Sequence, residues 1–141
     1  HRLERGQTMD HRYYIDNCLR PLIDEIKRQR PSCGTHNIKI HHDHGKPHVH
    51  RDVCTYLESK GFTIMPHPPN SPDLSPCNFW LFDLIKDNLS DQSDSQSLYD
   101  AVVNFMYSLS NEEHKKTFEK WMERMQLCID NQGGYIEHLM K

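Results

Sequence analysis

Apolar residues recur at helical spacing in several stretches of this chain and alternate with polar residues in two short ones. In the first stretch the apolar positions are Ile15, Leu19, Leu22, Ile23 and Ile26. This spacing predicts a helix over about residues 10–29, with Thr8 or Asp10 as its N-cap. Because an interior proline costs about 3 kcal/mol, Pro21 should kink the helix or restart it, and Pro31 should end it.

A strand, a helix and a second strand are expected next. Ile38 and Ile40 alternate with polar residues, which predicts a short strand that carries Asp43 at its C-terminal end. The helical stripe that follows consists of Val49, Val53, Tyr56 and Leu57. Gly61 is placed to end that helix as its C′ residue, and residues 62–65 form the second strand. This order favours parallel strands joined by a right-handed crossover.

Prolines dominate the segment over residues 66–76 and predict an extended loop, because each fixes φ and removes a backbone donor. Ser75 as N-cap and Pro76 at the first helical position should then begin a helix, with Asn78 in its first turn. The apolar positions of this helix are Leu81, Leu84, Ile85 and Leu89. Residues 90–97 are rich in Ser, Asp and Gln and indicate a flexible linker.

Two amphipathic helices are expected after that linker, over residues 98–141. The first has its apolar positions at Leu98, Val102, Phe105 and Met106. Ser110 and Glu113 match a capping box at the start of the second. Its apolar positions are Phe118, Trp121, Met122, Met125 and Ile129. The chain is thus predicted to be one small domain, with a strand and helix core over residues 1–89 and helices after the linker.

Composition narrows the class of protein. The 141 residues are 35% hydrophobic and 26% charged, which limits the chain to a single small core. No run approaches the roughly 18 apolar residues that would span a bilayer. The five cysteines are odd in number and lack a Cys-x-x-Cys pair, so they favour a reducing compartment over a disulfide framework. A net charge of −3 argues against a generic basic coat for nucleic acid.

Two motifs carry most of the functional information. Asp43 lies in His-His-Asp-His-Gly-Lys-Pro-His (41–48), and Asn78 follows Ser-Pro-Asp-Leu-Ser-Pro-Cys (71–77), so 34 residues separate the two. The pair resembles the last two positions of the acidic triad in mariner-family transposases of the Tc1/mariner group. The resemblance runs from about Gly6 to the end, where Cys128 and the segment 134–137 are similar to the closing part of the family's catalytic domain.

The resemblance implies a fold. It is a truncated ribonuclease-H-like α/β architecture, with short parallel strands flanked by helices and the first three strands missing. The family's first catalytic aspartate lies far upstream of the second, and only 42 residues precede Asp43, so we expect that aspartate to be missing as well. The strand over residues 37–42 would then have an unpaired edge. We expect this edge to be covered by another chain, such as a second copy, by the N-terminal segment or by a part of the parent protein outside this sequence.

The resemblance also implies a chemistry. In such sites two divalent ions orient the nucleophile and stabilise the leaving oxygen of a phosphodiester, and Mg²⁺ or Mn²⁺ needs oxygen ligands. Asp43 and Asn78 are the candidate catalytic and metal-binding residues, and Lys46 and His48 are the candidate contacts to DNA. An amide at position 78 deletes a charge worth ~4 kcal/mol at about 4 Å and an effective dielectric near 20, before desolvation is subtracted.

We therefore expect a transposase-derived nuclear domain related to metal-dependent DNA cleavage and strand transfer, inactive on its own. The alternative is a domesticated, non-catalytic module that binds DNA or protein. A rival for the histidines is a transition-metal site around Asp43. Its ligands would be His41, His42, His44, His48 and His50. Asp73 is expected to brace its loop. The aromatic residues expected to lie in the core, rather than to stack on bases, are Phe79, Trp80, Phe82 and Trp121.

Overall fold

The computed structural model describes residue 3 and residues 6–89 and 94–140. The chain divides into two compact units, an N-terminal unit (His1–Asn70) and a C-terminal unit (Ser71–Lys141). The boundary falls in the proline-rich segment, ahead of the predicted linker. Of that linker, residues 90–93 lie outside the described residues, and Ser95 to Ser97 form the first turn of a helix capped by the Asp94 side chain.

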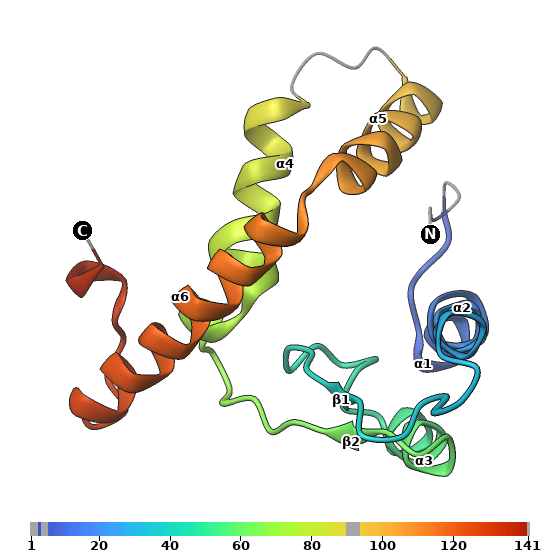
Figure 1. The fold of residues 1–141 in the computed structure, drawn as a ribbon, viewed down its shortest axis with the longest axis horizontal. Coiled ribbons are helices and arrows are strands. Elements are labelled where there is room, and N and C mark those ends of the chain that lie inside the picture. Colours follow the sequence, from blue (N-terminus) through green and yellow to red (C-terminus); the bar gives the residue numbers. More distant parts are fainter. Residues whose placement is uncertain (1–2, 4–5, 90–93, 141) are drawn as a thin grey trace. The chain divides into compact units, whose positions relative to one another are not determined.

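The N-terminal unit begins with one continuous helical path (Figure 1). Its parts are α1 (His11–Tyr14), the π-helical turn η1 (Ile15–Leu19) and α2 (Arg20–Gln29). Asp10 is the N-cap, and its side chain accepts a backbone N–H of the first turn at 2.8 Å. The wider turn of η1 comes directly before Pro21, which has no N–H to donate. After this turn α2 starts with Pro21 in its first turn, as one of the two predicted outcomes has it, and ends at Arg30 as C-cap, directly before Pro31.

Two short strands follow, with a helix between them in the sequence. β1 (Lys39–Ile40) and β2 (Thr63–Ile64) pair in parallel, and α3 (Arg51–Ser59) connects them (Figure 1). Two more ladder bonds flank this pair, from the N–H of Thr63 to the Ile38 carbonyl at 3.1 Å and from the N–H of Met65 to the Ile40 carbonyl at 2.8 Å. The predicted parallel pair is confirmed, although both strands are shorter than expected.

The core of the N-terminal unit lies between the first helical path, α3 and β2. Its buried members are Leu19, Ile23, Val53, Leu57 and Phe62. Gly61 has a φ of +82°, and its N–H bonds to the Glu58 carbonyl while the N–H of Phe62 bonds to the Leu57 carbonyl. This Schellman motif confirms Gly61 as C′ residue and turns Phe62 into the core. Val49, expected in the apolar stripe, precedes α3 and is 45% exposed.

The C-terminal unit is helical in its described part. Its elements are the 3₁₀ turns η2 (Pro72–Leu74) and η4 (Glu137–Leu139), the π-helical turn η3 (Cys77–Leu81), and the helices α4 (Phe82–Asn88), α5 (Ser95–Ser108) and α6 (Asn111–Asp130). The segment over residues 66–76 was predicted to be an extended loop throughout. This is wrong for Pro72–Leu74, which form the 3₁₀ turn η2. Helical bonding starts at the Ser75 carbonyl, which accepts the N–H of Asn78 and of Phe79, so the predicted helix start is confirmed.

Helix α6 is fixed to η2 by polar contacts from buried side chains. Its predicted capping box at Ser110 is present. Trp121 Nε1 donates to the Leu74 carbonyl at 2.8 Å, and Arg124 Nη1 donates to the Asp73 carbonyl at 2.9 Å. The Asp73 carboxylate in turn accepts the N–H of Ile136 at 3.1 Å. Asp73 is therefore a brace of its loop, as predicted.

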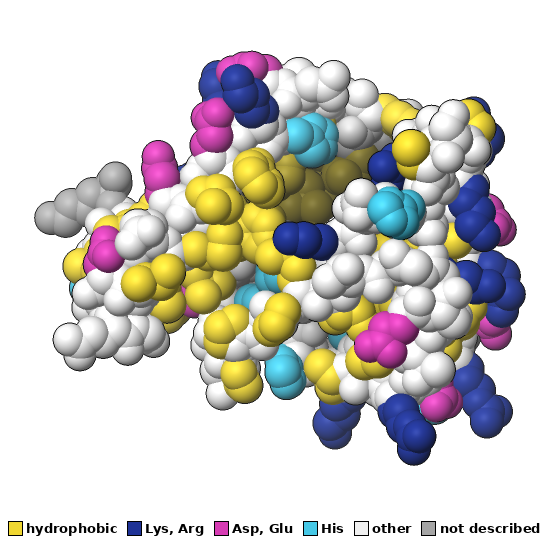
Figure 2. Space-filling model, turned by 60° about the horizontal axis from the view of Figure 1, so that its bottom comes forward, with side chains coloured by type: hydrophobic (Ala, Val, Ile, Leu, Met, Phe, Trp, Pro, Cys, Tyr) yellow, Lys and Arg dark blue, Asp and Glu magenta, His cyan; other side chains and the backbone are white. Residues whose placement is uncertain are grey.

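Part of the apolar pattern of α6 is not buried. Trp121 is 9% exposed, but Phe118, Met122 and Ile129 are 57%, 51% and 70% exposed. Hydrophobic side chains also reach the surface on the face shown in Figure 2, interspersed with charged ones. The predicted core position is thus confirmed for Trp121 but wrong for Phe82 of α4, which is 47% exposed. No helix of the described chain is both long and apolar enough to cross a bilayer.

Candidate functional site

Asp43 lies in the loop that follows β1 and is held there by two hydrogen bonds. The N–H of Gly45 donates to Asp43 Oδ1 at 2.9 Å, and His48 Nδ1 lies 2.6 Å from the same oxygen. Since a carboxylate oxygen can only accept, His48 Nδ1 is the donor. A Cβ on Gly45 would come within 3.0 Å of Asp43 Oδ1, so glycine allows this close approach. Both bonds reach Oδ1, which leaves Oδ2 as the oxygen to offer to a cation.

These contacts keep Asp43 ionised. The Gly45 N–H lowers the pKa of Asp43 below its ordinary value, partial burial opposes this, and the hydrogen bond from His48 lowers it further. The side chain is 49% exposed, so its charge is also accessible from solvent. Asp43 thus combines a fixed orientation with a full negative charge at neutral pH, as a ligand for a hard cation requires.

The loop around Asp43 is joined to the segment after β2 through His67. His41 Nε2 and His67 Nδ1 lie 3.0 Å apart, and His44 Nδ1 donates to the His67 carbonyl at 3.1 Å. A cavity of about 230 Å³ opens beside Asp43. Its lining includes His42, Asp43, His44, His48, Met65 and His67. The acid therefore faces a solvent-accessible hollow within the N-terminal unit.

His42 is the most perturbed histidine of this loop. Its ring stacks on that of His48, with centroids 5.0 Å apart, and its Nδ1 is buried with no hydrogen-bond partner among the described residues. Burial lowers the pKa of His42 to about 4, with a further decrease from nearby His48 and an opposing effect of Asp43. His42 is therefore neutral in the folded protein at pH 7.

We expect His42→Phe to make the free energy of unfolding of the N-terminal unit depend less on pH at acidic pH. An unfolded histidine binds its proton near pH 6.5, whereas folded His42 binds it near pH 4, so the unfolded state gains protons first as pH falls. Stability should therefore drop between about pH 6.5 and 4, by at most ~3 kcal/mol from this residue.

The measurement is urea unfolding at several pH values, followed by the amide NMR signal of Leu57 in α3. His36→Phe, at an exposed histidine, is the matched control and should keep the wild-type slope. An unchanged slope in His42→Phe would show that other groups cause the acid sensitivity.

Asn78 lies in the first turn of the helix that begins after Ser75, in the π-helical turn η3. It lines a second cavity, of about 250 Å³, within the C-terminal unit. The other residues of this cavity are Pro72, Asp73, Phe79, Asp83, Tyr135 and Glu137. Position 78 is therefore accessible and surrounded mainly by acidic and aromatic neighbours.

The two predicted metal ligands belong to different units, Asp43 to the N-terminal one and Asn78 to the C-terminal one. That they share an ion stays a prediction. Lys46 is exposed, and His48 is hydrogen-bonded to Asp43, so the predicted contacts of both residues with DNA also stay predictions.

Sequence reasoning missed His67 and the roles of Gly45 and His48 in orienting Asp43. Only the close spacing of Asp43, Gly45 and His48 within one motif could have indicated the latter.

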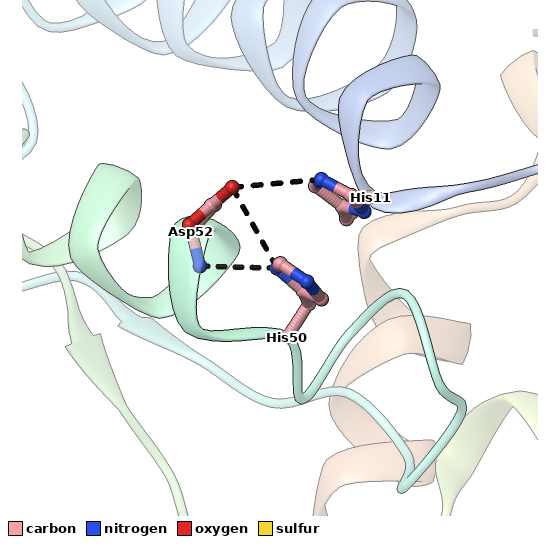
Figure 3. Close-up of side chains that lie close together, drawn as sticks. All are labelled: His11, His50 and Asp52. Atoms are coloured by element: carbon pink, nitrogen blue, oxygen red, sulfur yellow. Dashed lines mark hydrogen bonds and ion pairs between the residues drawn. The ribbon is translucent and has the colours of Figure 1, made fainter.

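The rival transition-metal site around Asp43 does not form as predicted. Among the described residues, one group of at least three His, Cys, Asp or Glu side chains brings its donor atoms together, and it consists of His11, His50 and Asp52 (Figure 3). Of the five predicted histidines it contains only His50. The other four histidines do not bring their donor atoms together with Asp43 as a group of three or more, although His48 Nδ1 lies 2.6 Å from Asp43 Oδ1 and the rings of His42 and His48 stack.

Comparison with known proteins shows what the chain is similar to. No family model matches the chain. The chain is 30% identical to the human histone-lysine N-methyltransferase SETMAR, over 96% of its own length and 20% of that protein. It is 27% identical to the Mariner Mos1 transposase of Drosophila mauritiana, over 96% of its own length and 40% of that protein. The chain thus spans less than half of either relative.

Solved structures agree. The crystal structure of the Mos1 mariner transposase catalytic domain matches with a TM-score of 0.86 and 27% identity, over 96% of this chain and 68% of that one. The Mos1 paired-end complex with the left transposon end matches with a TM-score of 0.85 and 26% identity, over 96% and 40% of the two chains. In sequence and in its truncated ribonuclease-H-like fold, this chain is a relative of the mariner transposases and corresponds to a part of their catalytic domain.

Proposed function

We propose that this chain is part of a DNA-processing domain in which Asp43 and Asn78 are ligands of a divalent cation, Mg²⁺ or Mn²⁺. The observation that carries the proposal is Asp43 itself. It is ionised, oriented through Oδ1 by Gly45 and His48, and open to solvent beside a cavity. The relatives support the choice of metal, because the Mos1 catalytic domain has been solved with Mn and with Mg.

The residues of this chain fit such an ion unequally. Asp43 supplies a charged oxygen and Asn78 a neutral one, while the metal, when bound, would stabilise charge on a phosphodiester. An amide in place of a carboxylate weakens the attraction for a dication by ~4 kcal/mol before desolvation, at about 4 Å and an effective dielectric near 20. We therefore propose that the chain by itself binds the metal weakly and does not cleave DNA.

The test combines metal binding with a nuclease assay on the full chain. Mn²⁺ titration by calorimetry should show binding that Asp43→Ala abolishes and that Asp24→Ala, at an exposed acid of α2, leaves intact. Incubation with DNA and Mg²⁺ or Mn²⁺ should give no cleavage. Cleavage that depends on Asp43 would contradict the proposal that the chain alone does not cleave DNA, but it would support Asp43 as a metal ligand. If Asp43→Ala left Mn²⁺ binding unchanged, Asp43 would not be a ligand.

A second candidate function is a domesticated, non-catalytic module that binds DNA or protein. Two observations favour it, namely the amide at position 78 and the exposed apolar residues of α6. Lys46 and His48 are the proposed DNA contacts. Fluorescence anisotropy with a labelled duplex separates the two functions. A module should bind DNA equally well in wild type and Asp43→Ala without metal, and should lose affinity in Lys46→Ala.

DNA is the proposed partner and the nucleus is the proposed compartment, since the Mos1 relative is seen in complex with its transposon end.

We also propose that a second chain covers the free edge of the two-stranded sheet. In the described residues β1 and β2 each have a single strand partner, and an open strand edge invites pairing. Analytical ultracentrifugation should then show a dimer. Lys39→Pro should weaken this dimer, because proline has no backbone N–H to donate to a further strand.

A further inference from the structure

Outside the proposed site, one cluster in the N-terminal unit combines the donor types of a transition-metal site. His11 lies at the start of α1, and His50 and Asp52 lie at the start of α3 (Figure 3). Their donor atoms all lie within 4.8 Å of one another. We propose that His11, His50 and Asp52 bind a zinc-type transition-metal ion that links the beginnings of these two helices.

The separations are close to those that zinc needs. Zn²⁺ bonds of about 2.0–2.1 Å at tetrahedral angles put neighbouring donor atoms roughly 3.3 Å apart. Asp52 Oδ2 lies 3.5 Å from His11 Nε2 and 3.8 Å from His50 Nδ1. These two pairs must therefore close by only a few tenths of an ångström, and the His11–His50 pair, within 4.8 Å, by no more than about 1.5 Å.

Access is also sufficient. The side chains of His11, His50 and Asp52 are 25%, 41% and 60% exposed, so an ion can enter from solvent. Three protein ligands leave the fourth position of a tetrahedral zinc ion to water. The carboxylate supplies the negative charge that partly neutralises the ion, in a place where two helix N-termini would otherwise repel it.

Binding requires a small rearrangement of the two rings. His11 and His50 stack with centroids 3.7 Å apart and an interplanar angle of 8°. The lone pairs of parallel rings point in parallel directions, so one ion cannot lie in both ring planes and the rings must tilt. Rotation about the histidine χ2 is soft, which makes this tilt inexpensive. The metal would also replace the bond from the Asp52 N–H to His50 Nδ1, which is long at 3.2 Å.

The choice of ion follows from the donors. Imidazole nitrogen suits zinc, copper and nickel, whereas Mg²⁺ prefers oxygen alone. The proposed zinc site thus differs in chemistry and residues from the Asp43 site. Because an ion that binds only the folded state stabilises it, by about 2.7 kcal/mol at 100 times the dissociation constant, zinc should raise the melting temperature of the N-terminal unit.

Calorimetry of the full chain with ZnCl₂ tests the proposal. The wild type should bind one equivalent of Zn²⁺ at this site. His11→Ala and Asp52→Asn should each weaken the binding of that equivalent at least tenfold, whereas the control His36→Ala should bind it as the wild type does. The melting temperature should rise with Zn²⁺ only in the wild type and in the control. Far-UV circular dichroism verifies that each variant is folded, and His11→Gln replaces His11→Ala if that variant is not.

Two results would overturn the zinc site. One is that the wild type binds no Zn²⁺, and the other is that His11→Ala and Asp52→Asn bind as many equivalents as the wild type, as tightly. Asp43→Ala should retain this equivalent, so failure of the zinc site and failure of the proposed Mg²⁺ or Mn²⁺ site are separate outcomes.

Discussion

Replacing Arg124 with alanine is expected to destabilise the C-terminal unit by about 2–3 kcal/mol, less than the roughly 3–5 kcal/mol for breaking a fully buried charge pair, because its partner Glu137 is 38% exposed. Arg124 is 3% exposed. Its Nη1 donates to the Asp73 carbonyl at 2.9 Å and to Glu137 Oε1 at 2.7 Å, and its guanidinium lies 4.2 Å from the Phe79 ring centroid. Truncation would leave a carbonyl and a carboxylate without their donor and a space beside the ring.

Tryptophan fluorescence during urea unfolding measures this effect selectively. Both tryptophans of the chain, Trp80 and Trp121, lie in the C-terminal unit, so the signal reports that unit. Lys120→Ala, at an exposed position of α6, is the control and should change stability by no more than about 0.5 kcal/mol. A loss below about 1 kcal/mol in Arg124→Ala would mean that α6 is not fixed to η2 by this side chain.

The substitution Asn78→Asp is expected to strengthen Mn²⁺ binding roughly 10- to 100-fold, or about 1.4–2.8 kcal/mol. A restored carboxylate adds one unit of charge next to the dication, and solvent access reduces the gain below the ~4 kcal/mol limit. Asp83 and Glu137 line the same cavity, so a new carboxylate would also be repelled by its neighbours until a cation neutralises it.

Calorimetry with MnCl₂ measures this gain, with Asn88→Asp as the matched control. Asn88 is exposed at the end of α4, outside the cavity, and its conversion adds the same charge without a ligand. The gain in Asn78→Asp should disappear when Asp43→Ala is added. If Asn78→Asp and Asn88→Asp strengthened Mn²⁺ binding equally, the gain would come from the added negative charge alone. Asn78 would then not be a ligand of the ion.

Local chemistry explains which elements could be predicted from the sequence. The capping box at Ser110 and the C′ glycine at Gly61 depend on bonds within a few residues, so residue type and spacing were enough to place them. The parallel pair of strands followed from the strand–helix–strand order. The π-helical turn before Pro21 was missed, because propensity indicates that a proline disturbs a helix but not how the backbone adapts.

Non-local contacts explain what could not be predicted. Arg124 looked like one more charge on an amphipathic helix, and only the fold reveals its buried contacts with Asp73 and Glu137. In the same way His11 meets Asp52 only because α1 packs against α3. The apolar stripe of α6 indicated an amphipathic helix but not which of its residues would be covered.

Paramagnetic broadening by Mn²⁺ tests the central claim most directly, namely that Asp43 and Asn78 bind one divalent ion. In ¹⁵N-labelled protein, substoichiometric Mn²⁺ should broaden the amide signals of Gly45 and Phe79 together, and Asp43→Ala should abolish both effects. Broadening confined to one of the two amides, or broadening of Phe79 that persists in Asp43→Ala, would contradict the shared ion and the site built on it.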